Sequence, residues 1–194
     1  MKQKKTSAMP TIQQLKEELQ RESYRGKFKR TLRSTISILI VAAAAVVLIS
    51  NLLLPVLRIY GSSMTPTLVN GNIVVALRQG SYERGDIIAF YYNNKVLVKR
   101  VIGLSGEWVD IDEDGNVYID DVLLEETYIE EKSSGECDVT LPYQVPDGRH
   151  FVMGDHRSVS SDSRSSEIGC VSEEQIIGKL VFRIWPLSEF GFVN

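Results

Sequence analysis

The feature that most constrains this chain is an uncharged stretch of 23 residues from Thr35 to Leu57. At a rise of about 1.5 Å per residue, a helix of this length crosses a hydrocarbon core of about 30 Å. A buried core helix is normally shorter and amphipathic. A cleavable signal peptide has a shorter apolar stretch followed by a small-x-small site. We therefore expect an uncleaved transmembrane anchor over residues 35–57.

Charge is distributed unevenly on the two sides of this stretch. Residues 1–34 hold 10 Lys/Arg and 3 Asp/Glu, a net +7, whereas residues 35–194 hold 12 and 22, a net −10; the sum is −3. A basic head suits anionic lipid, and the positive-inside rule places it in the cytoplasm. The acidic remainder disfavours a nucleic-acid partner, because it would repel phosphates.

Three regions follow from this pattern. Residues 1–34 are a cytoplasmic basic head with a short amphipathic helix over residues 10–24, residues 35–57 are the anchor, and residues 58–194 are an extracytoplasmic β domain. In the short helix, Ile12, Leu15 and Leu19 share one face, which favours a helix lying against the membrane interface.

From Val56 onward the sequence consists of short β-like runs separated by Gly, Asn and Asp. The step Asp114-Gly115 predicts a hairpin, and a second turn is expected at residues 92–94. Residues 125–137 are acidic and are expected to form a surface excursion, and a short helix is expected near residues 172–176. The fold class is therefore mainly β, with coiled antiparallel sheets or a partly open barrel. The expected strands are 56–60, 72–78, 86–92, 95–104, 107–112, 116–120, 138–144, 150–155 and 179–186.

No spacing of His, Cys, Asp and Glu in the sequence resembles a metal site. His150 and His156 lack partners at ligand spacing, so no metal and no cofactor is expected. Cys137 and Cys170 both lie in the outer part of the chain, where a disulfide could form, but their spacing does not decide whether they pair.

Nucleophilic catalysis is the remaining chemistry to consider. The turn GSSMTPTL, residues 61–68, exposes Ser63 beside free backbone N–H groups. Two bases are conceivable: His156 next to Asp155, as in a Ser-His-Asp arrangement, or Lys99 in a buried strand. Burial disfavours the ammonium ion and lowers a lysine pKa from about 10.4 by several units. Taken alone, neither the turn nor the lysine decides the question.

Five segments together carry a family resemblance. They are, in order, GSSMTPTL (61–68), RGDIIAF (84–90), KRVIGLSGE (99–107), GDHRSVSSDSR (154–164) and IIGKLVFRIWP (176–186). The chain closely resembles the type I signal peptidase family over residues 59–186. Its single anchor and short head are similar to the form typical of Gram-positive bacteria.

The resemblance implies roles for individual residues. Ser63 is the implied nucleophile and Lys99 the implied general base, a lysine being typical of bacterial members. Ser160 matches the serine that hydrogen-bonds and orients the lysine amine, and Asp162 and Arg164 match a supporting ion pair.

Neighbouring residues depart from these roles or support them. By the same resemblance Asp155 and Arg157 are scaffolding, and His156 stands where the family usually has Asn. Lys95 shares strand parity with Lys99 but lies off the motif, so we expect it to be solvated.

Oxyanion and substrate residues are also implied. Gly61 occupies a position where some members carry an oxyanion-binding serine, so the Ser63 N–H must contribute more here or another donor must lie nearby. The implied oxyanion region is Gly61, Ser62 and Ser63, and the implied substrate-binding residues are Ile59, Val98 and, less directly, Leu57.

The implied activity is removal of signal peptides with Ala-x-Ala sites from secretory preproteins at the outer face of the cell membrane. The partners are then preproteins and the bilayer, with no nucleic acid, and the oligomeric state stays open. Two alternatives remain: the related Ser/Lys self-cleaving repressors, which carry a DNA-binding head where this chain has an apolar span, and a non-enzymatic anchored β-module.

Overall fold

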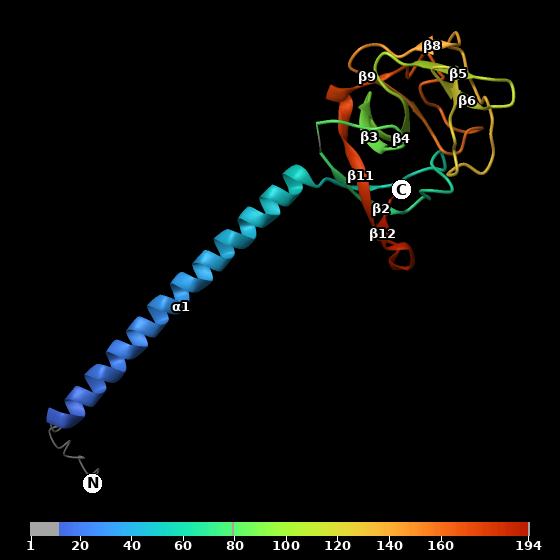
Figure 1. The fold of residues 1–194 in the computed structure, drawn as a ribbon. Helices are drawn as coiled ribbons and strands as arrows, with labels where there is room; N and C mark the ends of the chain where they lie inside the picture. Colours follow the sequence, from blue (N-terminus) through green and yellow to red (C-terminus); the bar gives the residue numbers. More distant parts are fainter. Residues whose placement is uncertain (1–11, 79, 194) are drawn as a thin grey trace. The chain divides into compact units, whose positions relative to one another are not determined.

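The computed structural model describes residues 12–78 and 80–193, and the chain divides into two units between Ile49 and Ser50. Most of α1 (Ile12–Leu53) belongs to the first unit, and this one continuous helix includes residues 12–24 of the predicted interfacial helix and most of the predicted anchor (Figure 1), whereas residues 10 and 11 of the prediction lie outside the described residues. Its portion Leu15–Leu48 is long and apolar enough to cross a membrane, and none of that portion is buried. A core helix would be covered, so this helix is compatible with membrane anchoring.

The helix ends earlier than the sequence predicted. It stops at Leu53, and Val56 and Leu57 belong to a strand instead. Pro55 explains the difference, because proline cannot donate a helical hydrogen bond and disfavours the helical conformation of the residue before it. The assignment of the two flanks to cytoplasm and exterior stays a prediction.

The second unit is built on an eight-stranded antiparallel sheet. Figure 1 shows β11 running between β2 and β3. The strands, in spatial order, are β1 (Val56–Arg58), β2 (Ile73–Leu77), β11 (Ile176–Trp185), β3 (Ile87–Tyr92), β4 (Lys95–Gly103), β9 (Arg149–Met153) and β10 (Val171–Ser172), with β12 (Gly191–Phe192) paired to β11.

A smaller antiparallel sheet has the order β7 (Val122–Leu123), β6 (Val117–Ile119), β5 (Trp108–Ile111) and β8 (Tyr143–Gln144). The hairpin predicted at Asp114-Gly115 is confirmed, since β5 and β6 pair across it and Gly115 has a φ of +79°. Short 3₁₀ helices occur at Glu173–Gln175 and Leu187–Glu189. The predicted mainly β fold is confirmed, and its sheets do not close into a barrel.

The sequence missed three strands of two residues each, β7, β10 and β12, and it overestimated the strand over residues 138–144, of which only β8 forms. A two-residue strand contains a single alternation, so its pattern cannot be distinguished from that of a loop.

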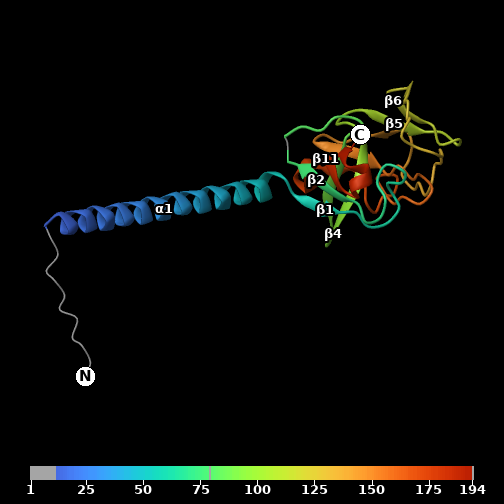
Figure 2. The same ribbon diagram turned by 90° about the horizontal axis from the view of Figure 1, so that it is seen from below.

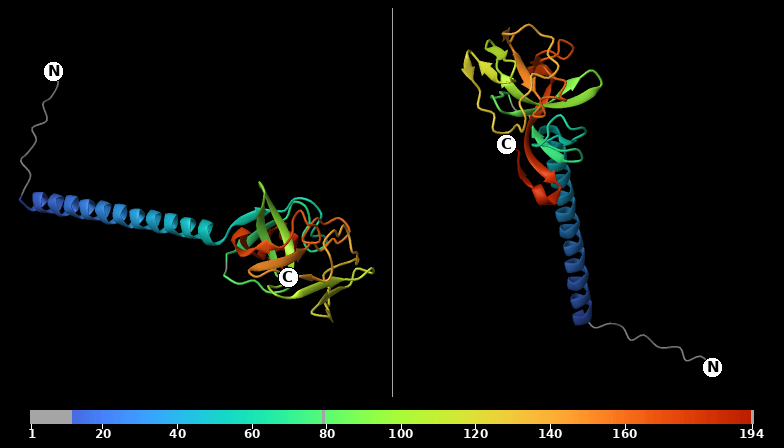
Figure 3. Two further views of the ribbon diagram at one scale, coloured as in Figure 1. Left: turned by 90° about the horizontal axis from the view of Figure 1, so that it is seen from above. Right: turned by 90° about the vertical axis from the view of Figure 1, so that its right-hand side faces the viewer.

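The hairpin of β3 and β4 turns at Asn93, whose φ of 51° is in the left-handed region that Asn tolerates. This turn was predicted at residues 92–94. The hairpin projects from the rest of its unit, as Figure 2 and Figure 3 show from different sides. The projecting part of β4 leads directly into the buried segment that holds Lys99.

Candidate active site

Ser63 lies in the loop between β1 and β2. Met64 and Leu68 anchor this loop, because both side chains are buried in a hydrophobic cluster under the two strands. The Thr65 N–H donates to the Ser62 carbonyl at 3.1 Å, and the Leu68 N–H donates to the Met64 carbonyl at 2.8 Å. Ser63 itself is half-buried, and within the described part of the chain neither its hydroxyl nor its N–H has a hydrogen-bond partner.

Lys99 lies in β4 and pairs in register with Ile88 of β3. Its side chain is buried, with the residue only 3 % exposed, and its Nζ donates to the Ser160 Oγ at 2.8 Å. Burial lowers the pKa of Lys99 to about 8; the Asp162 carboxylate acts in the opposite direction, and the Arg164 guanidinium lowers the pKa further. A substantial fraction of this amine is therefore neutral near neutral pH.

Ser63 and Lys99 line the same cavity of about 570 Å³. Leu57, Ile59 and Val98 also line it, so its wall is largely apolar, and the exposed Lys95 lies at the cavity as well. The structure thus brings the predicted nucleophile, the predicted base and the three predicted substrate-binding residues to one cavity.

Two strand edges border this cavity. β1 pairs with β2 on one side, and in the described residues no second strand adjoins it. β4 pairs with β3 along its length, but its pairing with β9 begins only at Arg100. The backbone of Lys95–Lys99 therefore has an edge open toward the cavity, which could accept an extended peptide.

A buried ion pair supports the Lys99 side of the cavity. Arg164 contacts both carboxylate oxygens of Asp162, at 2.8 and 2.9 Å. The Gly154 N–H donates to the same carboxylate at 2.9 Å. Burial alone would raise the pKa of Asp162, but these hydrogen bonds and the Arg164 charge hold it below its ordinary value. Arg164 also donates to the carbonyl of Ser160, at 3.2 Å, and so ties the loop that holds Ser160.

The alternative base is not arranged for catalysis. Asp155 accepts two hydrogen bonds from Arg100, at 2.9 and 2.8 Å, and one from Thr67 at 2.5 Å, so its carboxylate is held by donors other than His156. The His156 Nδ1 lies 2.9 Å from the Thr65 Oγ1, and His156 is not part of the cavity lining. In the described residues a Ser63–His156–Asp155 arrangement therefore lacks both of its side-chain contacts, from Ser63 to His156 and from His156 to Asp155.

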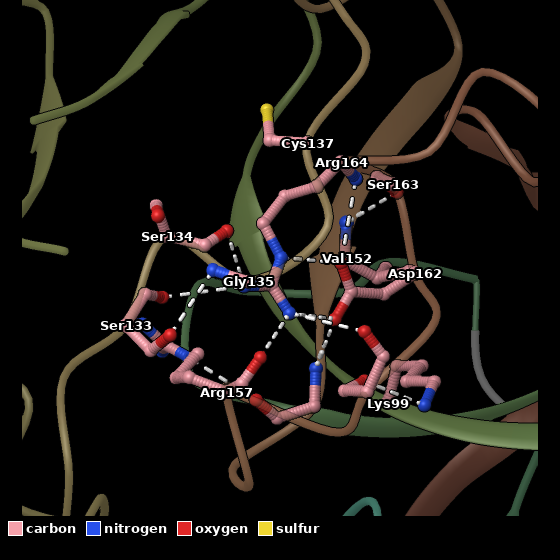
Figure 4. Close-up of polar contacts among 12 residues, drawn as sticks. Lys99, Ser133, Ser134, Gly135, Cys137, Val152, Arg157, Asp162, Ser163 and Arg164 are labelled. Atoms are coloured by element: carbon pink, nitrogen blue, oxygen red, sulfur yellow. Dashed lines mark hydrogen bonds and ion pairs between the residues drawn. The ribbon is translucent and has the colours of Figure 1, made fainter. Parts of the chain in front are cut away.

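The acidic segment 125–137 was predicted to be a surface excursion, and for several of its residues this is wrong. Glu126 forms an ion pair with Arg157, and both side chains are buried. The carbonyl of Ser134 accepts a hydrogen bond from Arg164 at 2.8 Å. Figure 4 shows Arg164 held between Asp162 on one side and this segment on the other. The segment is thus part of the scaffold under the site.

The two cysteines are not joined. Cys137 and Cys170 both have free thiols. In Figure 4 the Cys137 sulfur points away from the Arg164 cluster. Cys170 is buried, and burial raises the pKa of its thiol to about 11, which makes it unreactive.

Comparison with known proteins identifies the family of this chain. The family model described as "Signal peptidase, peptidase S26" matches residues 32–185. The chain belongs to this family. A signal peptidase IB of Staphylococcus aureus (strain MRSA252) is 32 % identical over 185 residues, covering 84 % of this chain and 95 % of the relative. A signal peptidase I U of Bacillus subtilis (strain 168) is 36 % identical over 177 residues, covering 84 % and 93 %.

A crystal structure of a signal peptidase I from Enterococcus faecalis V583 is similar at 33 % identity and a TM-score of 0.45, over 52 % of this chain and 97 % of that one.

Three residues in the site of this signal peptidase were not found from the sequence: Thr65, Thr67 and Glu126. Each reaches a partner outside its own segment, namely His156, Asp155 and Arg157. Because these partners are 31 to 91 positions away along the chain, no local sequence pattern pointed to the three residues.

Proposed function

We propose that this chain is a membrane-anchored serine endopeptidase that removes N-terminal signal peptides from secreted preproteins, with Ser63 as nucleophile and Lys99 as general base. Membership of the signal peptidase family supports signal-peptide removal by a serine protease. The observation that carries the residue assignment is that Ser63 and the buried, weakly basic Lys99 line one apolar cavity.

The proposed reaction proceeds through an acyl-enzyme. Neutral Lys99 takes the Ser63 hydroxyl proton as Oγ attacks the scissile carbonyl, and the developing oxyanion is held by the Ser63 N–H. The C–N bond then breaks, and the new amino terminus leaves with the proton from Lys99. Lys99 next takes a proton from water, the hydroxide attacks the ester, and Ser63 regains its proton as the signal peptide leaves.

Supporting residues orient this base. The Ser160 hydroxyl accepts a hydrogen bond from the Lys99 amine. This bond fixes one N–H of the amine, so that the lone pair of the neutral nitrogen can be oriented toward Ser63. Asp162 and Arg164 hold the loop that carries Ser160. The Lys99 amine and the Ser63 hydroxyl form no hydrogen bond with each other in the structure, and we expect bound substrate to bring them into contact, because catalytic hydrogen bonds often tighten only in the enzyme–substrate complex.

Substrate recognition is proposed at the two open strand edges. An extended signal peptide terminus adds a strand between β1 and the Lys95–Lys99 part of β4, and main-chain hydrogen bonds supply the affinity. Leu57, Ile59 and Val98 shape shallow apolar pockets that favour the small residues of an Ala-x-Ala site. The anchor keeps the β domain at the outer face of the cell membrane, with the basic head in the cytoplasm.

Cleavage in a membrane tests this proposal. The full chain is reconstituted in liposomes with a radiolabelled secretory preprotein, and mature product is followed over time. We expect Ser63→Ala and Lys99→Ala to lose cleavage while keeping the circular dichroism of the wild type. Ser62→Ala is the matched control, because it keeps the hydroxyl at position 63 and should still cleave. Substantial turnover by either Ser63→Ala or Lys99→Ala would refute the assignment.

A further inference from the structure

His156 is connected to the nucleophile loop by two hydrogen bonds. The backbone N–H of His156 donates to the Ser63 carbonyl at 3.1 Å, and the ring Nδ1 of His156 lies 2.9 Å from the Thr65 Oγ1. The Thr65 hydroxyl in turn donates to the Ser62 carbonyl at 2.8 Å. A chain of contacts thus runs from the imidazole of His156, through Thr65, to the peptide bond that precedes Ser63.

The single proton of the Thr65 hydroxyl decides which group donates in each of these hydrogen bonds. The Thr65 hydroxyl has one proton, and the Ser62 carbonyl can only accept, so the hydroxyl proton belongs to that bond. The contact between Thr65 and His156 is then a hydrogen bond only if Nδ1 carries a proton and donates. Which ring nitrogen is protonated depends on such a partner. His156 is therefore in the Nδ1–H form.

The peptide bond at the end of this chain is the one that matters for the oxyanion. The Ser62 carbonyl and the Ser63 N–H belong to the same planar trans unit, so holding the oxygen also fixes the direction of the N–H. Thr65 holds that oxygen twice, through its hydroxyl at 2.8 Å and its N–H at 3.1 Å. Consecutive hydrogen bonds polarise one another, which makes the Ser63 N–H a stronger donor.

Gly61 cannot provide a hydrogen-bond donor for the oxyanion. It has no side chain, and its N–H already donates to the Asn70 Oδ1 at 3.3 Å. Its φ of +88° also disfavours any residue with a side chain at this position. Ser63, by contrast, lines the cavity, and its N–H has no acceptor in the part of the chain that the structure describes.

We propose that His156 and Thr65 are positioning residues, which orient and polarise the Ser62–Ser63 peptide so that the Ser63 N–H binds the oxyanion without help from position 61. This inference rests on the proposed function, since it needs Ser63 to be the nucleophile. An asparagine could take the place of this histidine, because its Nδ2 also branches from Cγ and can donate to the Thr65 hydroxyl.

Kinetics of preprotein cleavage in liposomes test the role in turnover. For His156→Leu we expect kcat to fall roughly tenfold with KM little changed, because the Ser63 N–H is then less well oriented and polarised toward the oxyanion of the transition state (about 1.4 kcal/mol per tenfold). Thr65→Val should lower kcat by a similar factor. The double variant should lose no more kcat than either single variant, because each substitution interrupts the same series of hydrogen bonds. His156→Asn should recover most of the loss. Ser158→Ala, exposed in the same loop, is the matched control for this series.

A spectroscopic measurement tests the tautomer independently of turnover. The full chain in detergent micelles, labelled with ¹⁵N-histidine, should show the His156 Nδ1 as the protonated ring nitrogen at alkaline pH, with His156→Asn identifying the signal. The Nε2–H tautomer would overturn the inference. So would an unchanged kcat in a folded His156→Leu, or additive losses in the double variant.

Failure of the inference can be told from failure of the proposed function. If only the inference fails, wild type cleaves, Ser63→Ala does not, and His156→Leu cleaves like wild type. If the proposed function fails, Ser63→Ala cleaves as well as wild type, or wild type does not cleave at all, and the positioning role fails with it.

Discussion

Acidification is expected to inactivate this signal peptidase through one group, the Lys99 amine. Burial lowers its pKa from 10.5 to about 8, and the residue is 3 % exposed. The shift corresponds to roughly 3 kcal/mol against the charged form. At pH 7 about a tenth of the amine is then neutral, compared with roughly 0.03 % for an ordinary lysine.

The assay is the pH dependence of kcat/KM for preprotein cleavage in liposomes between pH 6 and pH 11. We expect a plateau above pH 8 and, below it, a loss of about tenfold per pH unit, so that about 1 % of the plateau remains at pH 6. Lys95→Met is the matched control, because this exposed lysine lines the same cavity and its removal should leave the position of the acid limb unchanged.

Two outcomes would contradict this reasoning. A limb that appeared only near pH 10 would mean that burial does not lower the pKa of Lys99. A limb near pH 6.5, where an ordinary histidine titrates, would instead identify a histidine as the base if it disappeared in His156→Asn.

Three further predictions concern the scaffold. Lys99→Met should raise the free energy of unfolding at pH 7 by about 1–3 kcal/mol. Because the pKa of Lys99 is lower in the folded than in the unfolded protein, the destabilisation caused by its buried charge is complete below pH 8, declines between pH 8 and 10.5, and is absent above. Thermal melts of the wild type and the variant at pH 7 and pH 10.5 measure this difference. Ser160→Ala should lower kcat roughly tenfold in the folded protein, because it removes the acceptor that orients Lys99; equal kcat values would contradict this role. Glu126→Gln should destabilise the protein by about 3 kcal/mol, because the buried Arg157 loses its counter-charge, whereas the exposed Glu125→Gln should not; denaturant melts compare them.

Much of the fold could be predicted from local sequence patterns. The uncharged run, the alternation in the long strands and the turns at Asn93 and Gly115 each depend on residues close together in the chain, and the structure has the long helix and both hairpins. The early end of α1 was also accessible, because Pro55 is a local signal that the length of the apolar run outweighed. Two-residue strands were not accessible, since they contain too little pattern.

The candidate site divides in the same way. The resemblance of five short segments to a known family, in that family's order, pointed to Ser63 and Lys99 as a prediction. Only the tertiary structure decided that β9 begins pairing at Arg100 and leaves the preceding edge open, and that His156 bonds to Thr65, 91 positions away. It also decided how deeply Lys99 is buried. Such features depend on the path of the whole chain. A buried polar group must form a hydrogen bond with whichever partner folding brings near it, and a local sequence pattern does not indicate which distant residue that partner is.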